Sequence, residues 1–176
     1  MDAYRCIVTK RDLRRYTGTA IERAVLLQIL DAGRRSGSAR NRQPWEFIVV
    51  TDPAALAHLA RGGRFAGHLA RAAAGIVLLV DTPRALFDAG RCAQNLMLAA
   101  WSLGIASCPV GLRDDGALRQ MLHLSERGVL ATTIALGYPD PRGRSRAERL
   151  ALAVVAQRGR KPLKSLVHWN RYGGSN

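Results

Sequence analysis

One stretch of this sequence constrains the fold more than any other: Phe87 to Leu103 has the composition of a helix and is apolar on almost every face. Its second half reads Leu-Met-Leu-Ala-Ala-Trp from Leu96 to Trp101. A helix that is apolar on most faces is buried on most faces. A domain of 176 residues can cover part of such a helix, and we expect a second subunit to cover the rest. Gly104 is expected to cap the C-terminal end.

Apolar residues at helical spacing also predict a helix from Thr19 to Arg35, opened by a capping box between Thr19 and Glu22. Helices and strands alternate without a regular strand–helix–strand rhythm, so both an α+β and an α/β arrangement stay open. No internal repeat is visible, and residues 1–176 are expected to form one domain. The further expected elements are strands at Glu46–Val50, Gly75–Val80, Ile105–Leu112, Val129–Leu136 and Leu150–Ala156, and helices at Asp52–Ala60, Asp115–Leu122 and Pro162–Val167.

The composition is that of a packed globular protein, with 48% hydrophobic residues. The longest apolar run, Ala72 to Val80, is too short to cross a bilayer, and Met1-Asp2 does not begin a basic and apolar leader. Three cysteines without C-x-x-C spacing and four scattered histidines indicate neither a disulfide framework nor a metal site. We therefore expect a cytoplasmic protein without a metal or a membrane partner.

The net charge is +14, from 27 Lys and Arg against 13 Asp and Glu. A basic surface can bind nucleic acid, but these residues are scattered, without a basic tail or interleaved aromatic residues. Nucleic-acid binding is therefore the weaker hypothesis, and we expect no nucleic-acid partner. A guanidinium group forms bidentate hydrogen bonds with phosphate, so the Arg excess favours an anionic small ligand.

Three segments carry most of the side chains that could form a binding site: Lys10–Tyr16, Ser36–Trp45 and Arg158–Leu163. The first and the last are basic and can hold a phosphate from two sides. The middle one offers Asn and Gln, which supply both the donors and the acceptors that the polar edge of a flat ring system requires. Each basic segment could equally be an ordinary solvated surface.

The sequence lacks a phosphate loop, a dinucleotide-binding glycine motif, a zinc-protease motif and a serine-hydrolase elbow. Cys108, beside Pro109 and without an evident basic partner, is interpreted as structural rather than nucleophilic. An enzyme with this sequence would therefore depend on a bound cofactor for the difficult chemical step.

Taken in order along the chain, these segments resemble the nitroreductase family of flavoproteins. Arg11-Asp12-Leu13-Arg14-Arg15-Tyr16 is similar to the family's R-[RS]-x-R-x-[FY] motif. Ser36 to Val50 resembles its S-x-x-N-x-Q-P-W-x-F entry to a strand. Residues 87–90 and 94–104 are similar to the family's central dimer helix. Its closing motifs are matched by Leu136–Pro139 and Arg160–Leu163.

The resemblance implies an α+β sandwich with a mostly antiparallel central sheet flanked by helices, assembled as an intertwined homodimer with FMN at the interface. The implied cofactor-binding residues come from four places. One subunit supplies Lys10, Arg11, Asp12 and Arg14; its partner supplies Gly37, Ser38, Ala39, Asn41 and Gln43; Pro109, Val110 and Gly111 lie along the ring; and Arg158 and Arg160 clamp the phosphate.

The implied function is an oxidoreductase that passes hydride from NADH or NADPH through the flavin to a quinone, a nitroaromatic compound or a similar small acceptor. No side chain is expected to act as a nucleophile, because the flavin N5 carries the chemistry, and Asp12 is the one possible catalytic residue. The chain is expected to lack the helical insertion that often covers the substrate. Asp12 stands where the family commonly has Ser. An Asp at this position resembles the branch of the family that cleaves flavin to dimethylbenzimidazole. It could move a proton, but a bond to a backbone amide or to Arg14 is the favoured role. The alternatives are such a flavin-cleaving enzyme and a non-catalytic flavin-binding module.

Overall fold

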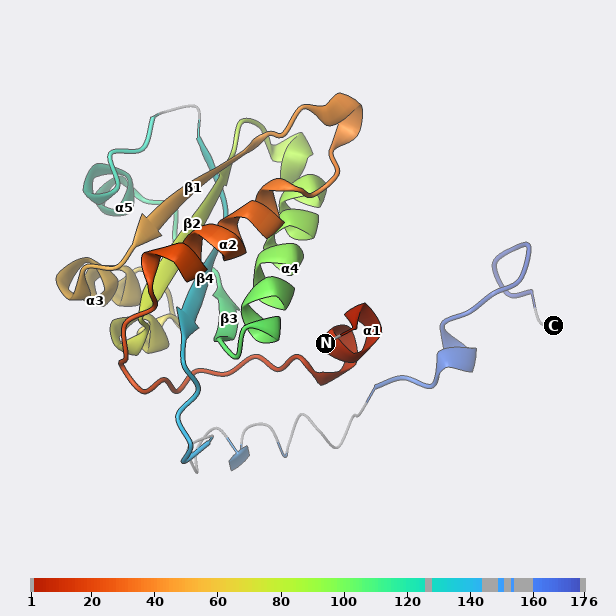
Figure 1. Ribbon diagram of the computed structural model, residues 1–176. Coiled ribbons are helices and arrows are strands. Elements are labelled where there is room, and N and C mark those ends of the chain that lie inside the picture. The colour runs from red at the N-terminus through yellow and green to blue at the C-terminus, as the bar shows by residue number, and fades with distance from the viewer. Residues whose placement is uncertain (1, 126–127, 144–148, 151–152, 154–159, 175–176) are drawn as a thin grey trace. The chain divides into compact units, whose positions relative to one another are not determined.

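The computed structural model describes residues 2–125, 128–143, 149–150, 153 and 160–174. The chain divides into two units, Met1–Gly143 and Arg144–Asn176. The first contains the sheet and its covering helices (Figure 1). In the second, the 3₁₀ helix η4 (Leu163–Ser165) lies within the segment that was predicted to be helical. The single domain over 1–176 stays a prediction.

Four strands form one sheet: β1 (Trp45–Val50), β2 (Ala74–Val80), β3 (Ala106–Val110) and β4 (Val129–Gly137). Their order is β1-β2-β4-β3, and each neighbouring pair is antiparallel. All seven residues of β2 are buried, which explains why its sequence is continuously apolar rather than alternating. The predicted antiparallel sheet is therefore confirmed, with β1 and β3 as its edge strands.

Helices cover both faces of this sheet. On one face lie α2 (Arg23–Arg34) and α4 (Leu86–Ser102), which share a core with Ile76 and Leu78 of β2. On the other face lie α3 (Pro53–Arg61) and the 3₁₀ helix η2 (Gly67–Arg71), packed against Val77 and Leu79. The short helix α5 (Gly116–Met121) contributes Leu118 to this second core. Alternate residues of β2 therefore serve the two cores.

The long helix α4 is the centre of the first layer, as its sequence predicts. Leu96 and Cys92 are fully buried against α2, where Gly33 allows the two helices to approach closely. A Cβ atom on Gly33 would lie 2.6 Å from Leu96 Cδ2. Gly104 follows the helix with a φ of 76° and donates to the Trp101 carbonyl at 3.1 Å, which confirms the expected glycine end.

Two expectations near the N-terminus are wrong. The helix expected from Thr19 begins at Arg23, and its cap residue Glu22 makes no side-chain capping bond. The hydroxyl of Thr19 instead bonds that of Thr17 at 3.0 Å. A further helix, α1 (Ala3–Thr9), was not predicted; Asp2 caps it by accepting a hydrogen bond from the Arg5 amide at 2.8 Å.

Most of the strand expected over Leu150–Ala156 falls outside the described residues, and Leu150 and Ala153, which are described, are helical rather than extended. No helix among the described residues is both long and apolar enough to span a membrane. Within the same part of the chain, no group of three or more His, Cys, Asp or Glu residues is placed to hold a metal ion.

Candidate functional site

The basic segment 10–16 runs along the outer edge of β3. Asp12 forms a parallel bridge with Ser107, and the Leu13 amide donates to the Ser107 carbonyl at 3.1 Å. Because β3 is an edge strand whose other side pairs with β4, this segment covers backbone groups that would otherwise be exposed. The contact brings two of the four predicted groups of site residues together, namely 10–14 and 109–111.

The C-terminal end of this segment is held by an aromatic contact. Tyr16 is 6% exposed, forms an antiparallel bridge with Pro139, and donates from its hydroxyl to the Leu13 carbonyl at 2.8 Å. Its ring lies over Gly137, where a Cβ atom would come within 2.7 Å of Tyr16 Cγ. Gly137 is therefore required for the close approach of the two segments.

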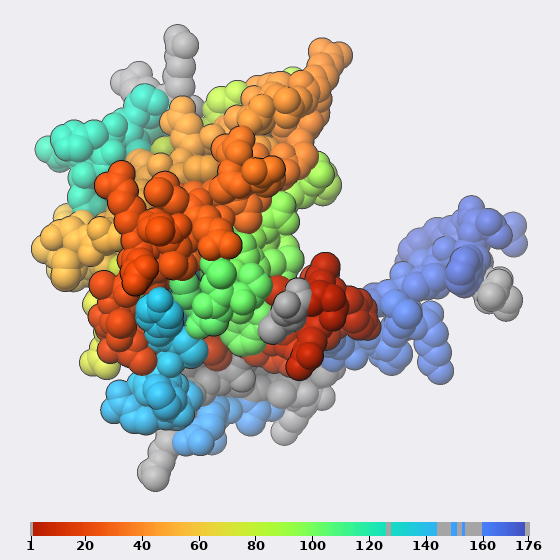
Figure 2. Space-filling model, in the orientation of Figure 1, coloured from red at the N-terminus to blue at the C-terminus, as the bar shows by residue number. Residues whose placement is uncertain are grey.

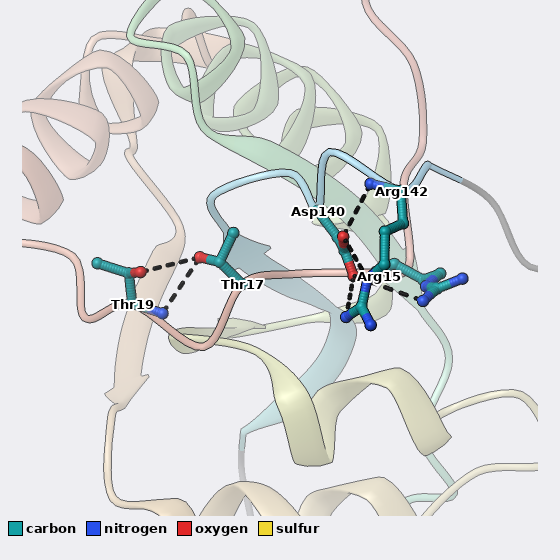
Figure 3. A network of polar contacts seen from close by, with 5 residues as sticks. All are labelled: Arg15, Thr17, Thr19, Asp140 and Arg142. Atoms are coloured by element: carbon teal, nitrogen blue, oxygen red, sulfur yellow. Dashed lines mark hydrogen bonds and ion pairs between the residues drawn. The ribbon is translucent and has the colours of Figure 1, made fainter.

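A charged network continues from this contact (Figure 3). Asp140 is buried and accepts hydrogen bonds from the Arg142 amide at 2.9 Å and from the Arg142 guanidinium at 2.8–3.1 Å. Arg15 lies 3.5 Å from the same carboxylate, and the Asp140 amide donates to the Arg15 carbonyl at 3.1 Å. The hydrogen bonds from Arg142 lower the pKa of Asp140 to about 2, so it is ionised at neutral pH. Segment 10–16 is thus fixed to both β3 and the turn after β4.

The cations of this segment differ in their partners. Arg11 donates to the carbonyls of Val8 and Lys10, each at 2.9 Å, and so closes the end of α1. Lys10 is ion-paired with Asp12, and its Nζ also lies 3.5 Å from the Met97 sulfur on α4. The expectation that the Asp12 carboxylate bonds Arg14 or a backbone amide is therefore wrong, because Lys10 is its partner.

Arg14 lies beside the thiol of Cys108 on β3. Among the described residues, its guanidinium has neither a carboxylate nor a carbonyl partner, and the Cys108 thiol is the group with which it interacts. Cys108 is 1% exposed, and its burial raises the thiol pKa although Arg14 opposes the shift. The structural interpretation of Cys108 agrees with this burial, but the expected lack of a basic partner is wrong. Arg14 remains the side chain best placed to bind an anion.

The loop from Ser36 to Gln43 contains the 3₁₀ helix η1 (Ala39–Asn41) and has an unusual backbone. Arg40, Asn41 and Gln43 have φ values of 53°, 55° and 49°, in the left-handed region that non-glycine residues rarely adopt. Ser38 stabilises this path by accepting a hydrogen bond from the Gln43 amide at 2.9 Å. The loop therefore holds several backbone groups in a conformation that an ordinary turn would not give.

This loop is attached to α4 at Arg91 and Asn95. Asn95 donates to the Ser36 hydroxyl at 2.8 Å, and Gly37 lies so close to Arg91 that a Cβ atom would be 2.5 Å from its guanidinium. Lys10, in contrast, meets α4 at Met97. Figure 1 shows the η1 loop and the segment 10–16 at opposite ends of α4. One chain therefore does not bring residues 37–43 next to residues 10–14.

The last two predicted residues cannot be compared with the others. Arg158 lies outside the described residues, and Arg160 belongs to the second unit of the chain. Sequence reasoning also missed residues that shape the site. Gly137 entered the sequence analysis only as part of the motif Leu136–Pro139, and no role was predicted for Asp140. No sequence signal pointed to Ser107, whose buried hydroxyl has no hydrogen-bond partner within the described part of the chain.

Comparison with known proteins places this arrangement in a wider group. The chain matches the family model described as Nitroreductase family over residues 7–74 and 64–138. An Archaeoglobus fulgidus protein, provisionally named NADH dehydrogenase/NAD(P)H nitroreductase, is 33% identical over 149 residues, which cover 78% of this chain and 86% of that protein.

Two solved structures share the fold. One is a provisionally named nitroreductase from Desulfovibrio desulfuricans in complex with FMN, with a TM-score of 0.79 and 26% identity over 95% of this chain and 96% of that one. The other is the NADPH:FMN oxidoreductase of Vibrio harveyi in complex with NAD⁺, with a TM-score of 0.79 and 25% identity over 98% and 79% of the two chains.

Proposed function

The chain belongs to the nitroreductase family, and from this premise we propose that it transfers electrons from NAD(P)H through bound FMN to a small acceptor such as a quinone or a nitroaromatic compound. NAD(P)H-dependent flavin reduction is the activity that the family and its FMN- and NAD⁺-bound relatives support. The observation that carries the proposal is the fixed segment 10–14 beside β3, with Arg14 available for an anion.

The residues present fit FMN, which combines an anionic phosphate with a ring that has a polar edge. Arg14 offers five N–H donors in a rigid fork, on a backbone that Ser107 and Pro139 hold on either side. Pro109 and Gly111 are exposed beside the segment and have small or rigid side chains, so a flat ring can approach this backbone closely. FMN, when bound, supplies the capacity to accept hydride and to pass electrons on. The side chains of this site are then required to bind and orient the ring rather than to act as nucleophiles.

We further propose that the active form is a homodimer in which the loop 37–43 of one subunit meets the segment 10–14 of the other. Within one chain the loop contacts α4 at Arg91 and Asn95, whereas Lys10 contacts it at Met97, and Figure 1 shows the backbones of the two segments at opposite ends of the helix. Figure 2 shows part of α4 at the surface, between the orange residues that precede β1 and the red helix α1. Phe87 on α4 is 77% exposed and Tyr4 on α1 is 76% exposed, and a second copy would bury both.

In this proposal Gly37, Ser38, Ala39, Asn41 and Gln43 present amides and side chains to the flavin of the partner subunit. That Arg158 and Arg160 also bind the phosphate stays a prediction from the sequence. The acceptor would reach the exposed face of the ring directly, because this sequence lacks the helical insertion that often covers the substrate in this family.

The test compares two neighbouring arginines. Arg14→Ala should weaken FMN binding by about 1.5–3 kcal/mol, the contribution of a hydrogen bond to a charged group. Arg11→Ala is the matched comparison. The resemblance also implies that Arg11 binds the cofactor, but its guanidinium bonds two carbonyls at the end of α1, so its loss should change the FMN affinity much less. Flavin fluorescence titration measures both, and anaerobic stopped-flow absorbance with NADH and NADPH measures reduction.

Equal affinities in wild type and Arg14→Ala would place the anion elsewhere. If FMN binds but NADH and NADPH reduce it no faster than free FMN, the chain is a non-catalytic flavin-binding module rather than an enzyme. Sedimentation or light scattering on the same samples tests the dimer, and a monomer that binds FMN with full affinity would contradict the shared site.

A further inference from the structure

We propose that Asp12 lowers the reduction potential of the FMN bound at this site, by holding Lys10 in a neutralised ion pair. The inference rests on the proposed function, because it needs FMN beside segment 10–14. Asp12 is the only acidic residue between Lys10 and Arg15 in the sequence, and its carboxylate is in contact with the Lys10 ammonium group. Asp12 thus acts through Lys10 and is a positioning residue.

The burial of the two partners is unequal, and this asymmetry gives the pair its effect. The Lys10 side chain is 10% exposed, whereas that of Asp12 is 55% exposed. The ammonium group is therefore enclosed between its carboxylate and the Met97 sulfur at 3.5 Å, and sulfur does not compensate its charge. With Asp12 present, the pair has no net charge. Without it, a nearly buried positive charge would remain at the edge of the site.

Other nearby charges do not compensate for Asp12. Arg15 is engaged with Asp140, and Arg11 is engaged with backbone carbonyls. Arg14, Lys10 and Asp12 all lie close enough to Cys108 of β3 to influence the pKa of its thiol, which the two cations lower and Asp12 raises. The net charge beside β3 therefore becomes more positive by one unit when Asp12 is neutralised.

Reduction of bound FMN by a hydride donor adds two electrons and one proton, so the ring system gains one negative charge. A positive charge close to the ring favours that gain, and a carboxylate opposes it. Asp12 thus makes the bound cofactor a stronger reductant once it is reduced, which suits transfer to acceptors of low potential. A Ser at this position would leave Lys10 unpaired and the cofactor easier to reduce.

The experiment measures the midpoint potential of bound FMN by equilibration with reference dyes, in wild type and four variants. Asp12→Asn should raise the potential, because it releases Lys10; a tenfold stronger preference for reduced over oxidised FMN corresponds to about 30 mV for two electrons. Lys10→Met should lower it. Asp12→Glu keeps the carboxylate and should restore the wild-type value.

Asp31→Asn is the control, since Asp31 forms an ion pair with Arg34 and Arg35 on α2, and it should leave the potential unchanged. Circular dichroism verifies that each variant is folded, and a loss of folding in Asp12→Asn would still leave Lys10→Met and Asp12→Glu to decide. Equal potentials in wild type and Asp12→Asn, with FMN bound to both, would refute this inference alone. A folded wild type that binds no FMN would refute the proposed function, and the inference with it.

Discussion

Gly137→Ala tests the contact that fixes the proposed cofactor-binding segment to the sheet. The new Cβ atom would lie 2.7 Å from Tyr16 Cγ and 2.8 Å from Tyr16 Cβ and Cδ1. Tyr16 cannot rotate away freely, because its hydroxyl bonds the Leu13 carbonyl and the next residue, Thr17, bonds the Tyr138 carbonyl at 3.0 Å. The backbone at Gly137 is not left-handed, so the penalty is steric rather than conformational.

The expected size follows from two opposing effects. Overpacking of a well-packed contact costs about 1–3 kcal/mol. Replacing Gly by Ala restricts the unfolded chain and returns about 0.4–1 kcal/mol. The free energy of unfolding should therefore fall by about 0.5–2.5 kcal/mol, which corresponds to a decrease in Tm of about 1–10 °C for a chain of this size. Urea denaturation followed by circular dichroism measures the change, and the dependence on urea should stay constant.

Gly116→Ala provides the matched control. A Cβ atom there would meet no heavy atom within 4 Å, and the residue lies in the first turn of α5, where Ala is favourable. Its stability should equal or exceed that of the wild type. If Gly137→Ala is as stable as Gly116→Ala, Tyr16 does not lie over Gly137, and the account of how segment 10–16 is held is wrong.

Two further changes test the charged network and the core. Asp140→Asn should lower the free energy of unfolding at neutral pH. Because the pKa of Asp140 in the folded protein is lowered to about 2, this difference in stability from wild type should shrink as the pH falls from about 4 towards 2. Urea denaturation midpoints at several pH values measure it. A constant difference over that range would assign the loss to another cause. Leu96→Ala removes a fully buried side chain between α4 and α2 and should cost about 2–5 kcal/mol of unfolding free energy; a loss below 1 kcal/mol would contradict the packing at Gly33.

The strands and long helices of this fold follow from local sequence patterns. β2 was predictable because seven consecutive small or apolar residues have no polar face, and α3 because Asp52 caps a helix that opens with Pro53. The order β1-β2-β4-β3 was not predictable, because the pairing of β3 with β4 and of β2 with β4 depends on contacts distant in sequence.

The helix α1 shows why the N-terminal region was harder. Its sequence, Ala-Tyr-Arg-Cys-Ile-Val-Thr, contains mostly residues of low helix propensity. Contacts with α4 hold it in place: the Cys6 thiol donates to the Leu98 carbonyl at 3.3 Å, and the Trp101 indole donates to the Thr9 hydroxyl at 3.1 Å. Likewise, sequence spacing alone could not predict which neighbouring cation forms an ion pair with Asp12. The path of the segment along β3 brings the Lys10 ammonium group to the Asp12 carboxylate.

Charge alone does not single out the anion-binding residue in a chain with 27 basic and 13 acidic residues. Many arginines must lack a carboxylate partner, so the absence of one at Arg14 among the described residues is not distinctive in itself. What distinguishes Arg14 is the fixed backbone around it, with Leu13 bonded to Ser107 on one side and Tyr16 bridged to Pro139 on the other. An arginine whose main chain is already held loses less conformational entropy when its guanidinium binds a phosphate, so the same charge binds more tightly there than on a free surface. The position of a cation on a rigid edge of the sheet, rather than the number of cations, is therefore the basis for assigning cofactor binding to this part of the chain.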